Sequence, residues 1–142
     1  MMPVVTKTFS VCTSGNSDVV DVTADVARAV ASSKINAGIA VVFVAGSTAA
    51  ISTIEFEPGL KKDVPRALDK IAPYDADYEH HKRWGCDNGA AHVRSTVVGT
   101  SFTVPFSDKK LILGTWQQIC LLDFDTRARE REVVVQVLGS QK

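Results

Sequence analysis

The chain has 142 residues, with 16 acidic and 16 basic residues and a hydrophobic fraction of 45%. This length and composition are typical of one globular domain that needs no disulfides to stabilise its core. A formal net charge of zero argues against nucleic acid or an anionic membrane as a general partner, and it removes one barrier to self-association. No apolar run reaches the ~20 residues of a membrane helix, and the N-terminus has no signal-peptide pattern. The three widely spaced cysteines, without a Cys-x-x-Cys motif, predict a reducing cytoplasm.

The first half of the chain predicts strands interrupted by two helices. Thr23 is expected to cap the first helix through its hydroxyl, and Gly38 to be the left-handed residue that follows it. The unbroken apolar run 38–45 predicts a strand at the centre of a sheet, covered on both faces. Pro65 lies within the second helical pattern, so that helix either starts late, with Asp63 as cap, or is kinked. The expected elements are strands at 4–12, 18–22, 38–45 and 51–55 and helices at 23–34 and 60–71.

The second half predicts sequential hairpins. The segment 93–98 fits a short helix or a strand, and one or two helical turns are favoured. The charged run 127–132 is expected to be a solvated hairpin tip. Further strands are expected at 100–106, at 111–113 leading into 116–124, and at 132–138. Together these patterns predict a single α+β domain of about seven mostly antiparallel strands with two helices.

The segment from Tyr78 to Arg94 lacks apolar periodicity and contains all three histidines of the chain. Such a composition is typical of a functional loop. His80 and His92 flank a glycine-containing stretch, so both can face one cavity. They could hold a divalent ion with a carboxylate or water, or one could act as a general acid or base. The alternative is a pair of hydrogen-bonded histidines at a subunit boundary, and His81 is expected to point away and be solvated.

A polar turn and an acid from another part of the chain are expected to join these histidines. Ser47 and Thr48 lie among small residues that let an anion approach the backbone, although a packed turn is the alternative. Glu55 closes the following strand and is interpreted as a catalytic base or a carboxylate that orients a histidine, or else as a solvated acid. Arg94 would supply the fixed positive charge that a phosphate or carboxylate needs.

The remaining candidates each have a functional and a structural interpretation. Asn88 either caps the loop or binds a ligand through its amide. Trp116 could wall a pocket for a flat heterocycle, but a core position is favoured, and Trp84 is expected to pack at a boundary. Cys86 could be a soft ligand, a reactive thiol or neither. The other two cysteines, Cys12 and Cys120, are predicted to be core residues.

Several motifs of the chain resemble the YjbQ-like family over nearly its whole length. They are the strand-turn-strand stretch Gly38–Ile51 ending at Glu55, the Tyr78-x-His80 pair, the Asn88–Arg94 segment with His92, Leu113-Gly-Thr-Trp-Gln-Gln-Ile119, and Arg131–Gly139. The resemblance implies an α+β domain that assembles as a homotrimer, with histidine-rich sites near the subunit boundary where a metal can bind. It also implies a link to a secondary thiamine-phosphate synthase activity. Gly46 and Ala90 stand where many relatives have further histidines, which removes candidate metal ligands.

These expectations combine into a small trimeric cytoplasmic enzyme that acts on a phosphorylated or otherwise anionic small molecule. The histidines would do acid–base work or hold zinc or magnesium, and no nucleic acid or membrane partner is expected. Thiamine-phosphate formation displaces pyrophosphate and calls for Mg²⁺, yet the sequence has no Asp-rich metal motif. The competing hypothesis is a non-catalytic metal- or anion-binding trimer. The residues assigned to the site are His80, His92 and Glu55 for chemistry or metal binding, and Ser47, Thr48, Asn88, Arg94 and Trp116 for ligand binding.

Overall fold

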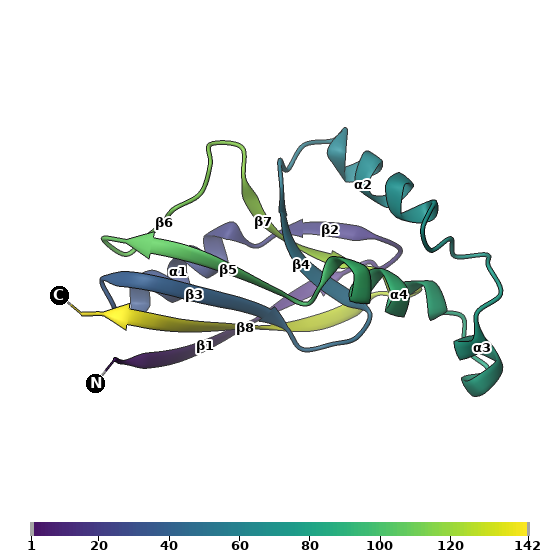
Figure 1. Ribbon diagram of the computed structural model, residues 1–142, viewed down its shortest axis with the longest axis horizontal. Helices are drawn as coiled ribbons and strands as arrows, with labels where there is room; N and C mark the ends of the chain where they lie inside the picture. The colour runs from purple at the N-terminus through teal and green to yellow at the C-terminus, as the bar shows by residue number, and fades with distance from the viewer. Residues whose placement is uncertain (1, 142) are drawn as a thin grey trace.

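Two antiparallel sheets and four helices make up the computed structural model, which describes residues 2–141 (Figure 1). The α+β class is confirmed, with eight strands rather than about seven and four helices rather than two. In chain order the elements are β1 (Val4–Thr13), β2 (Asp18–Asp21), α1 (Thr23–Ser32), β3 (Ala37–Val44), β4 (Ala49–Ile54), α2 (Leu60–Asp69), α3 (Glu79–Trp84), α4 (Gly89–Val98), β5 (Ser101–Ser107), β6 (Lys110–Leu111), β7 (Gln118–Asp123) and β8 (Arg129–Ser140).

The larger sheet has the strand order β1-β8-β3-β5-β6, and the smaller one has the order β2-β7-β4. The long strand β8 lies between β1 and β3 and pairs with both. In the β1–β8 register Val4 faces Leu138 and Thr13 faces Arg129, so the two strands run side by side over the whole length of β1. Figure 1 places both ends of the chain together, at the opposite end of the molecule from α3.

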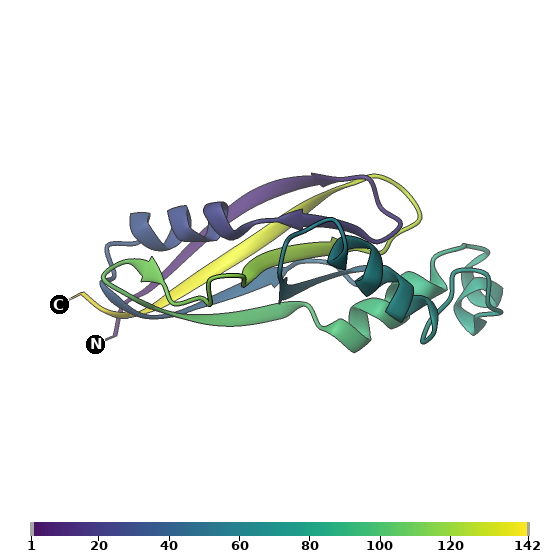
Figure 2. The same cartoon turned by 90° about the horizontal axis from the view of Figure 1, so that it is seen from above.

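The core lies between the inner face of the larger sheet and the layer formed by α1 and the smaller sheet (Figures 1 and 2). Val26 and Val30, one helical turn apart on α1, are fully buried there. A second apolar cluster lies on the other side of the smaller sheet, where Leu122 packs with Leu68 of α2 and Ala91 of α4. The smaller sheet is therefore covered on both faces.

Central strand β3 is placed as predicted, between β8 and β5, but the prediction that both its faces are covered is wrong. Its side chains alternate: Val42 and Val44 are buried, whereas Ile39 and Phe43 are 43% and 41% exposed. The strand buried on both faces is β7, which has five consecutive buried residues. An unbroken apolar run alone does not distinguish a strand buried on one face of its sheet from a strand buried on both. The outer face of a sheet can also be apolar when another chain covers it.

The segment from Tyr78 to Arg94, expected to be irregular, contains α3 and most of α4. Helix α3 ends at Gly85, which adopts a left-handed conformation with φ of 64°. The first half of helix α4 escaped detection because its buried positions are Gly and Ala rather than large apolar residues. The favoured helical interpretation of 93–98 is confirmed, since these residues form the second half of α4.

Three helix boundaries differ from the prediction for local reasons. Thr23 does not cap α1, whose N-cap is Val22 with no side-chain hydrogen bond. The left-handed residue after α1 is Lys34, with φ of 65°, and Gly38 already belongs to β3. Helix α2 runs from Leu60 through Pro65 rather than starting late, and the Glu57 carboxylate accepts hydrogen bonds from the first backbone N–H groups, in place of the expected Asp63 cap. Among residues 2–141, no helix has both the length and the apolar character that a membrane span requires.

Candidate functional site

The two outer histidines of the predicted loop meet at the junction of α3 and α4. The ring centroids of His80 and His92 are 4.4 Å apart, with an angle of 57° between the ring planes. Gly85 reverses the chain between the two helices, which folds α3 back toward the N-terminal half of α4. One chain therefore brings both imidazoles together, as the sequence predicted.

His81 holds this junction in place. Its Nε2 atom accepts a hydrogen bond of 2.9 Å from the backbone N–H of Gly89, the first residue of α4, and its ring lies 5.2 Å from the ring of Tyr78. A Cβ atom at Gly89 would lie 2.6 Å from the Tyr78 Cβ, so only glycine fits this close approach. The prediction of a solvated His81 is wrong, because its ring nitrogen satisfies one of the free N–H groups at the start of α4.

The environment of His92 favours its neutral form. Burial lowers the pKa of His92 below the ordinary histidine value, and the neighbouring His80 lowers it further. Asp125 and a hydrogen bond with the backbone of Ser47 act in the opposite direction without reversing the shift. At neutral pH the ring is therefore largely uncharged, the state in which an imidazole accepts a proton or binds a metal.

Asn88 connects this junction to the end of the smaller sheet. Its Nδ2 group donates a hydrogen bond of 3.4 Å to Oδ1 of Asp125. The Oδ1 atom of Asn88 is buried and has no hydrogen-bond partner among the described residues. An unpaired buried acceptor is unusual in a folded protein. The amide does not cap α4 through its side chain, so the ligand-binding interpretation of Asn88 stays open.

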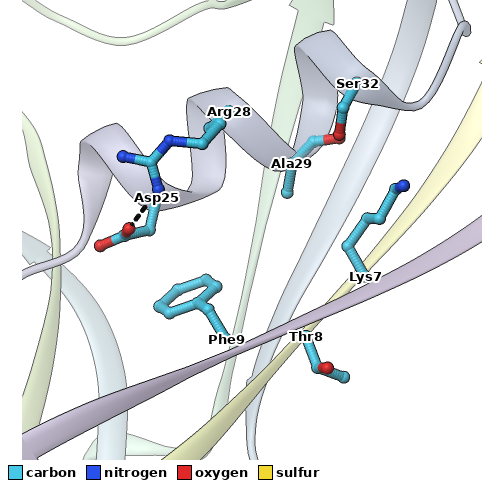
Figure 3. Close-up of a pocket in the computed structure, with 7 residues that line it drawn as sticks. All are labelled: Lys7, Thr8, Phe9, Asp25, Arg28, Ala29 and Ser32. Carbon is cyan, nitrogen blue, oxygen red and sulfur yellow. Dashed lines mark hydrogen bonds and ion pairs between the residues drawn. The ribbon is translucent and has the colours of Figure 1, made fainter.

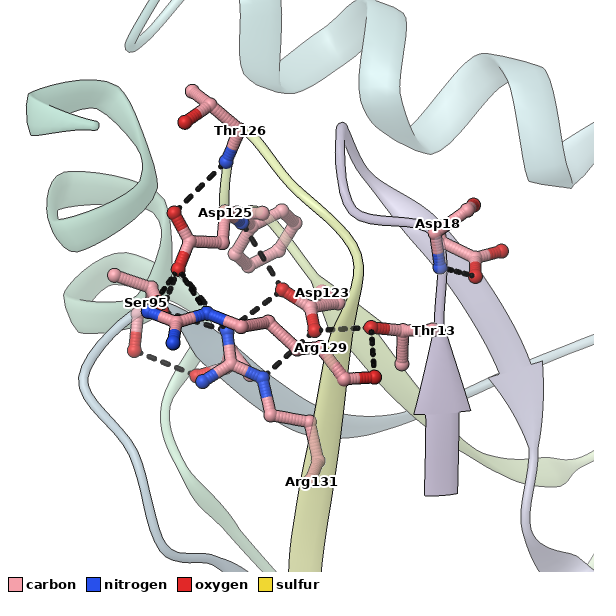
Figure 4. Close-up of polar contacts among 12 residues, drawn as sticks. Thr13, Asp18, Ser95, Asp123, Asp125, Thr126, Arg129 and Arg131 are labelled. Carbon is pink, nitrogen blue, oxygen red and sulfur yellow. Dashed lines mark hydrogen bonds and ion pairs between the residues drawn. The ribbon is translucent and has the colours of Figure 1, made fainter. Parts of the chain in front are cut away.

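Charged residues of β7, β8 and their connection form a buried network (Figure 4). Arg131 donates from Nε and Nη2 to the two carboxylate oxygens of Asp123, both at 2.7 Å. Nη2 also donates to the hydroxyl of Thr48 at 2.7 Å, and the hydroxyl of Thr13 donates to Asp123 at 2.6 Å. Burial alone would raise the pKa of Asp123, but the hydrogen bonds from Arg131 and Thr13 outweigh it and hold the pKa below the ordinary value.

This network corrects two expectations. The predicted solvated tip 127–132 is wrong for Arg131, which lies in β8 and is only 7% exposed, whereas Glu130 and Glu132 are exposed. Asp125 carries the second pair, accepting a hydrogen bond of 2.6 Å from Nε of Arg129. Two acids and two arginines at alternate positions on either side of a turn were the signal that could have revealed cross-strand ion pairs. The hydroxyl of Thr48 is held between Arg131 and Asp125, whereas Ser47 is exposed.

Arg94 does not face the histidines. Its side chain is fully buried and donates to the carbonyl of Ala72 at 2.9 Å, the hydroxyl of Ser17 at 2.9 Å and the carboxylate of Asp69 at 2.6 Å. Its guanidinium also lies 4.1 Å from the centre of the Tyr74 ring. Two residues along a helix turn the side chain by roughly 200°, so Arg94 points away from the side on which His92 lies. It ties α4 to the end of α2 and is not free to bind an anion.

Glu55 and Trp116 lie at the far end of the smaller sheet. The β4–β7 register pairs Ala49 with Asp123 and Ile54 with Gln118, so Glu55 follows the end of β4 that is remote from the Ser47–Thr48 turn. The intervening strand is about 17 Å long at ~3.4 Å per residue. Trp116 precedes β7 and is 69% exposed, so the favoured core position is wrong. Neither residue is brought to the histidines.

The cysteines differ in their surroundings. Cys12 is exposed, contrary to prediction, whereas Cys120 is buried as predicted, and burial raises the pKa of its thiol to about 12. Cys86 is half-buried, with Sγ 3.9 Å from the carbonyl oxygen of His80. Trp84, on α3, is 69% exposed.

A metal ion would find an incomplete set of ligands in one chain. Within residues 2–141, no three or more His, Cys, Asp or Glu side chains form a group that could hold a metal ion. The histidine pair supplies two imidazoles, whereas a zinc site needs three or four ligands from protein and solvent. The residues of a single chain therefore do not fit a metal site by themselves.

A separate pocket lies between α1 and β1, away from the histidines (Figure 3). Its volume is about 160 Å³, and its basic side chains include Arg28, which pairs with Asp25 at 2.7 Å. Both partners are at least one-third exposed, and none of the residues predicted for a site lines this pocket. The histidine junction is therefore the stronger candidate. The lining residues are Lys7, Thr8, Phe9, Asp25, Arg28, Ala29 and Ser32.

Comparisons with known proteins agree on one family. Residues 7–140 match the family described as "UPF0047 protein YjbQ-like". The chain is 34% identical over 134 residues to a UPF0047 protein of Methanocaldococcus jannaschii, covering 94% of each chain. It is 32% identical over 134 residues to the UPF0047 protein YugU of Bacillus subtilis, covering 94% of this chain and 98% of the relative.

Solved structures extend the likeness to the fold. A crystal structure from Sulfolobus solfataricus P2, described as a YbjQ-like protein of unknown function, has a TM-score of 0.91 and 34% identity, covering 99% of this chain and 100% of the other. A structure of an uncharacterised conserved protein of the same family from Clostridium acetobutylicum has a TM-score of 0.82 and 35% identity, covering 91% and 97%.

Proposed function

The chain belongs to the UPF0047 (YjbQ-like) family, and we propose that it is a small-molecule enzyme whose His80–His92 pair performs acid–base chemistry on an anionic or phosphorylated substrate. The observation that carries the proposal is the contact between the two rings at 4.4 Å, with the pKa of His92 lowered by burial and by His80. A neutral imidazole beside a second titratable ring can accept a proton from a substrate.

The surroundings of the pair support a defined binding geometry. Asn88 offers a buried carbonyl oxygen without a partner, which can accept a hydrogen bond from a substrate N–H or O–H group. His81 fixes the junction of α3 and α4, so the rings do not have to be ordered when substrate binds. Thiamine-phosphate formation, suggested by the family resemblance, belongs to this class of reaction and is the first to test.

The same proposal includes assembly as a homotrimer. Val4, Ile39 and Phe43 are 53%, 43% and 41% exposed on the outer face of the larger sheet, and self-association would cover apolar surface of this kind. A neighbouring subunit near the histidines would also supply the ligands that a metal ion lacks in one chain. Cytoplasmic location is part of the proposal, because all the cysteines are free thiols.

Turnover by single-residue variants tests the enzymatic proposal. Pyrophosphate release from thiamine precursors and hydrolysis of a panel of phosphate esters would be followed for the wild type, His92→Ala and His80→Ala. Loss of a general acid or base is expected to lower turnover about 100-fold or more. Val97→Ala, at an exposed position on the same helix, is the matched control and should keep full activity. Unchanged turnover in His92→Ala would rule the proposal out.

The second candidate is a non-catalytic metal- or anion-binding trimer, which the facing imidazoles also favour. Zn²⁺ or Mg²⁺ would be titrated into the purified protein while the histidine resonances are followed by NMR. Stoichiometric binding that is lost in His92→Ala, together with no turnover of any substrate, would replace the enzyme by this alternative.

A further inference from the structure

Gly46, in the connection between β3 and β4, leaves a space in front of a buried arginine. A Cβ atom built at this position would lie 3.0 Å from Nη1 of Arg131 and 4.0 Å from its Cζ. The backbone of Gly46 is not among the positive-φ glycines, so its conformation does not demand glycine. What the missing side chain provides is therefore room beside the guanidinium.

The guanidinium of Arg131 is held rigidly, with one nitrogen left over. Nε and Nη2 are bound by Asp123 and Thr48, each at 2.7 Å. None of the hydrogen bonds formed within residues 2–141 uses Nη1 as donor. The side chain is 8% exposed, so this donor is largely shielded from solvent. A fixed donor with an unused N–H is suited to bind an oxygen atom of a ligand.

The space at Gly46 adjoins the histidine junction. The next residue, Ser47, engages His92 through its backbone. The hydroxyl of Thr48 accepts a hydrogen bond from Arg131 and donates one to Asp125. Asp125 in turn accepts a hydrogen bond from Asn88. A small molecule lying against the His92 ring would therefore have Arg131 within the same cluster of residues.

We propose that the space at Gly46 binds one anionic oxygen, from a carboxylate or a phosphate, of the small molecule on which the histidine pair acts. This inference rests on the proposed function and assigns to Arg131 the role that the sequence suggested for Arg94. Asp123 already offsets the charge of Arg131, so the space receives a single oxygen through a charge-assisted hydrogen bond and does not enclose a whole anion. Affinity for a free inorganic anion is accordingly expected to be about millimolar.

The test follows the guanidinium of Arg131 by NMR in the full chain. Inorganic phosphate and acetate are titrated separately, which distinguishes a phosphate from a carboxylate oxygen. In the wild type, the Arg131 side-chain resonances are expected to shift saturably with at least one of the two anions. Gly46→Ala, whose methyl group would cover Nη1, should weaken that binding about tenfold, as expected for loss of one charge-assisted hydrogen bond.

Gly114→Ala is the matched control, because Gly114 also lacks a positive φ and its added Cβ would meet Gln117 only at an ordinary distance of 3.6 Å. This variant should bind as the wild type does, and thermal unfolding would verify that both variants are folded. The proposal is overturned if neither anion shifts Arg131 saturably, or if Gly46→Ala binds with wild-type affinity.

The outcome is separable from that of the proposed function. If His92→Ala abolishes turnover while Gly46→Ala binds phosphate and acetate normally, the anion site is wrong and the enzyme proposal stands. If Gly46→Ala loses anion binding while His92→Ala keeps its turnover, the anion site stands and the histidine mechanism is wrong.

Discussion

Replacing Asp123 by Asn is expected to destabilise the protein strongly. The carboxylate is fully buried and receives hydrogen bonds from Arg131, from Thr13 and from the backbone N–H of Asp125. Asparagine would leave the buried guanidinium of Arg131 with only the carboxylate of Asp125, 3.9 Å away and already paired with Arg129, as a counter-charge. It would also turn one amide group, a donor, toward other donors. Breaking a buried ion pair in this way costs about 3–5 kcal/mol.

Equilibrium unfolding in urea measures this cost directly. The matched control is Asp63→Asn, which removes the partner of Arg66 in a pair 3.3 Å long whose side chains are 60% and 71% exposed. That change should alter the free energy of unfolding by less than about 0.5 kcal/mol. The double variant Asp123→Asn with Arg131→Met should recover part of the loss, because it removes the stranded charge.

The pH dependence gives a second check with a defined sign. The pKa of Asp123 is lowered in the folded state, so its contribution is fully present above the unfolded-state pKa, near 3.9, and disappears as the pH falls through the lower folded-state value. The difference between wild type and Asp123→Asn should therefore narrow below about pH 4. A cost under about 1 kcal/mol at neutral pH, or one no larger than that of Asp63→Asn, would refute the reasoning.

Two further predictions concern the histidines. His81→Phe keeps a ring beside Tyr78 but removes the acceptor for the Gly89 N–H, so it should lower the free energy of unfolding by about 1–2 kcal/mol. His81→Gln retains an acceptor and should lower that free energy less. Urea unfolding compares the two variants, and equal losses of stability would contradict the capping role. Because the pKa of His92 is lowered in the folded state, the unfolded chain binds a proton at this residue at a higher pH than the folded chain does. Protonation therefore favours the unfolded state, and the free energy of unfolding should decline as the pH falls below about 6.5. His80→Ala removes one cause of that shift and should raise the His92 pKa in an NMR titration; an unchanged or lower value would count against the ring contact.

The strands were largely predictable because their signals are local. Alternating or continuous apolar runs placed β1, β3 and β5 to within a few residues, and turn residues marked the hairpins. The meeting of His80 and His92 was also within reach, since both lie in one short segment. Only the second half of helix α4 was predicted, at 93–98, because small and polar residues occupy the buried side of the helix and leave no apolar stripe.

The site residues that were predicted wrongly share a different reason: sequence spacing alone does not show toward which side of a strand or helix a side chain points. Glu55 was taken to adjoin the Ser47–Thr48 turn, but a strand separates its two ends by its full length. Arg94 is close to His92 in sequence, yet the helix turns it toward Asp69. Arg131 was read as part of a solvated tip because a charged run gives no indication of which members face inward; only the strand register, with its alternation of faces, settles that.

Helix α3 has a consequence for how defects in this protein would be found. It carries His80 but has no buried residue, so the core is complete without it. Substitutions in α3 that displace His80 but keep the hydrogen bond between Gly89 and His81 would leave expression yield and global melting nearly normal while separating the two imidazoles. Screens based on solubility or thermal shift would pass such variants, and only a readout at the histidines themselves would detect them.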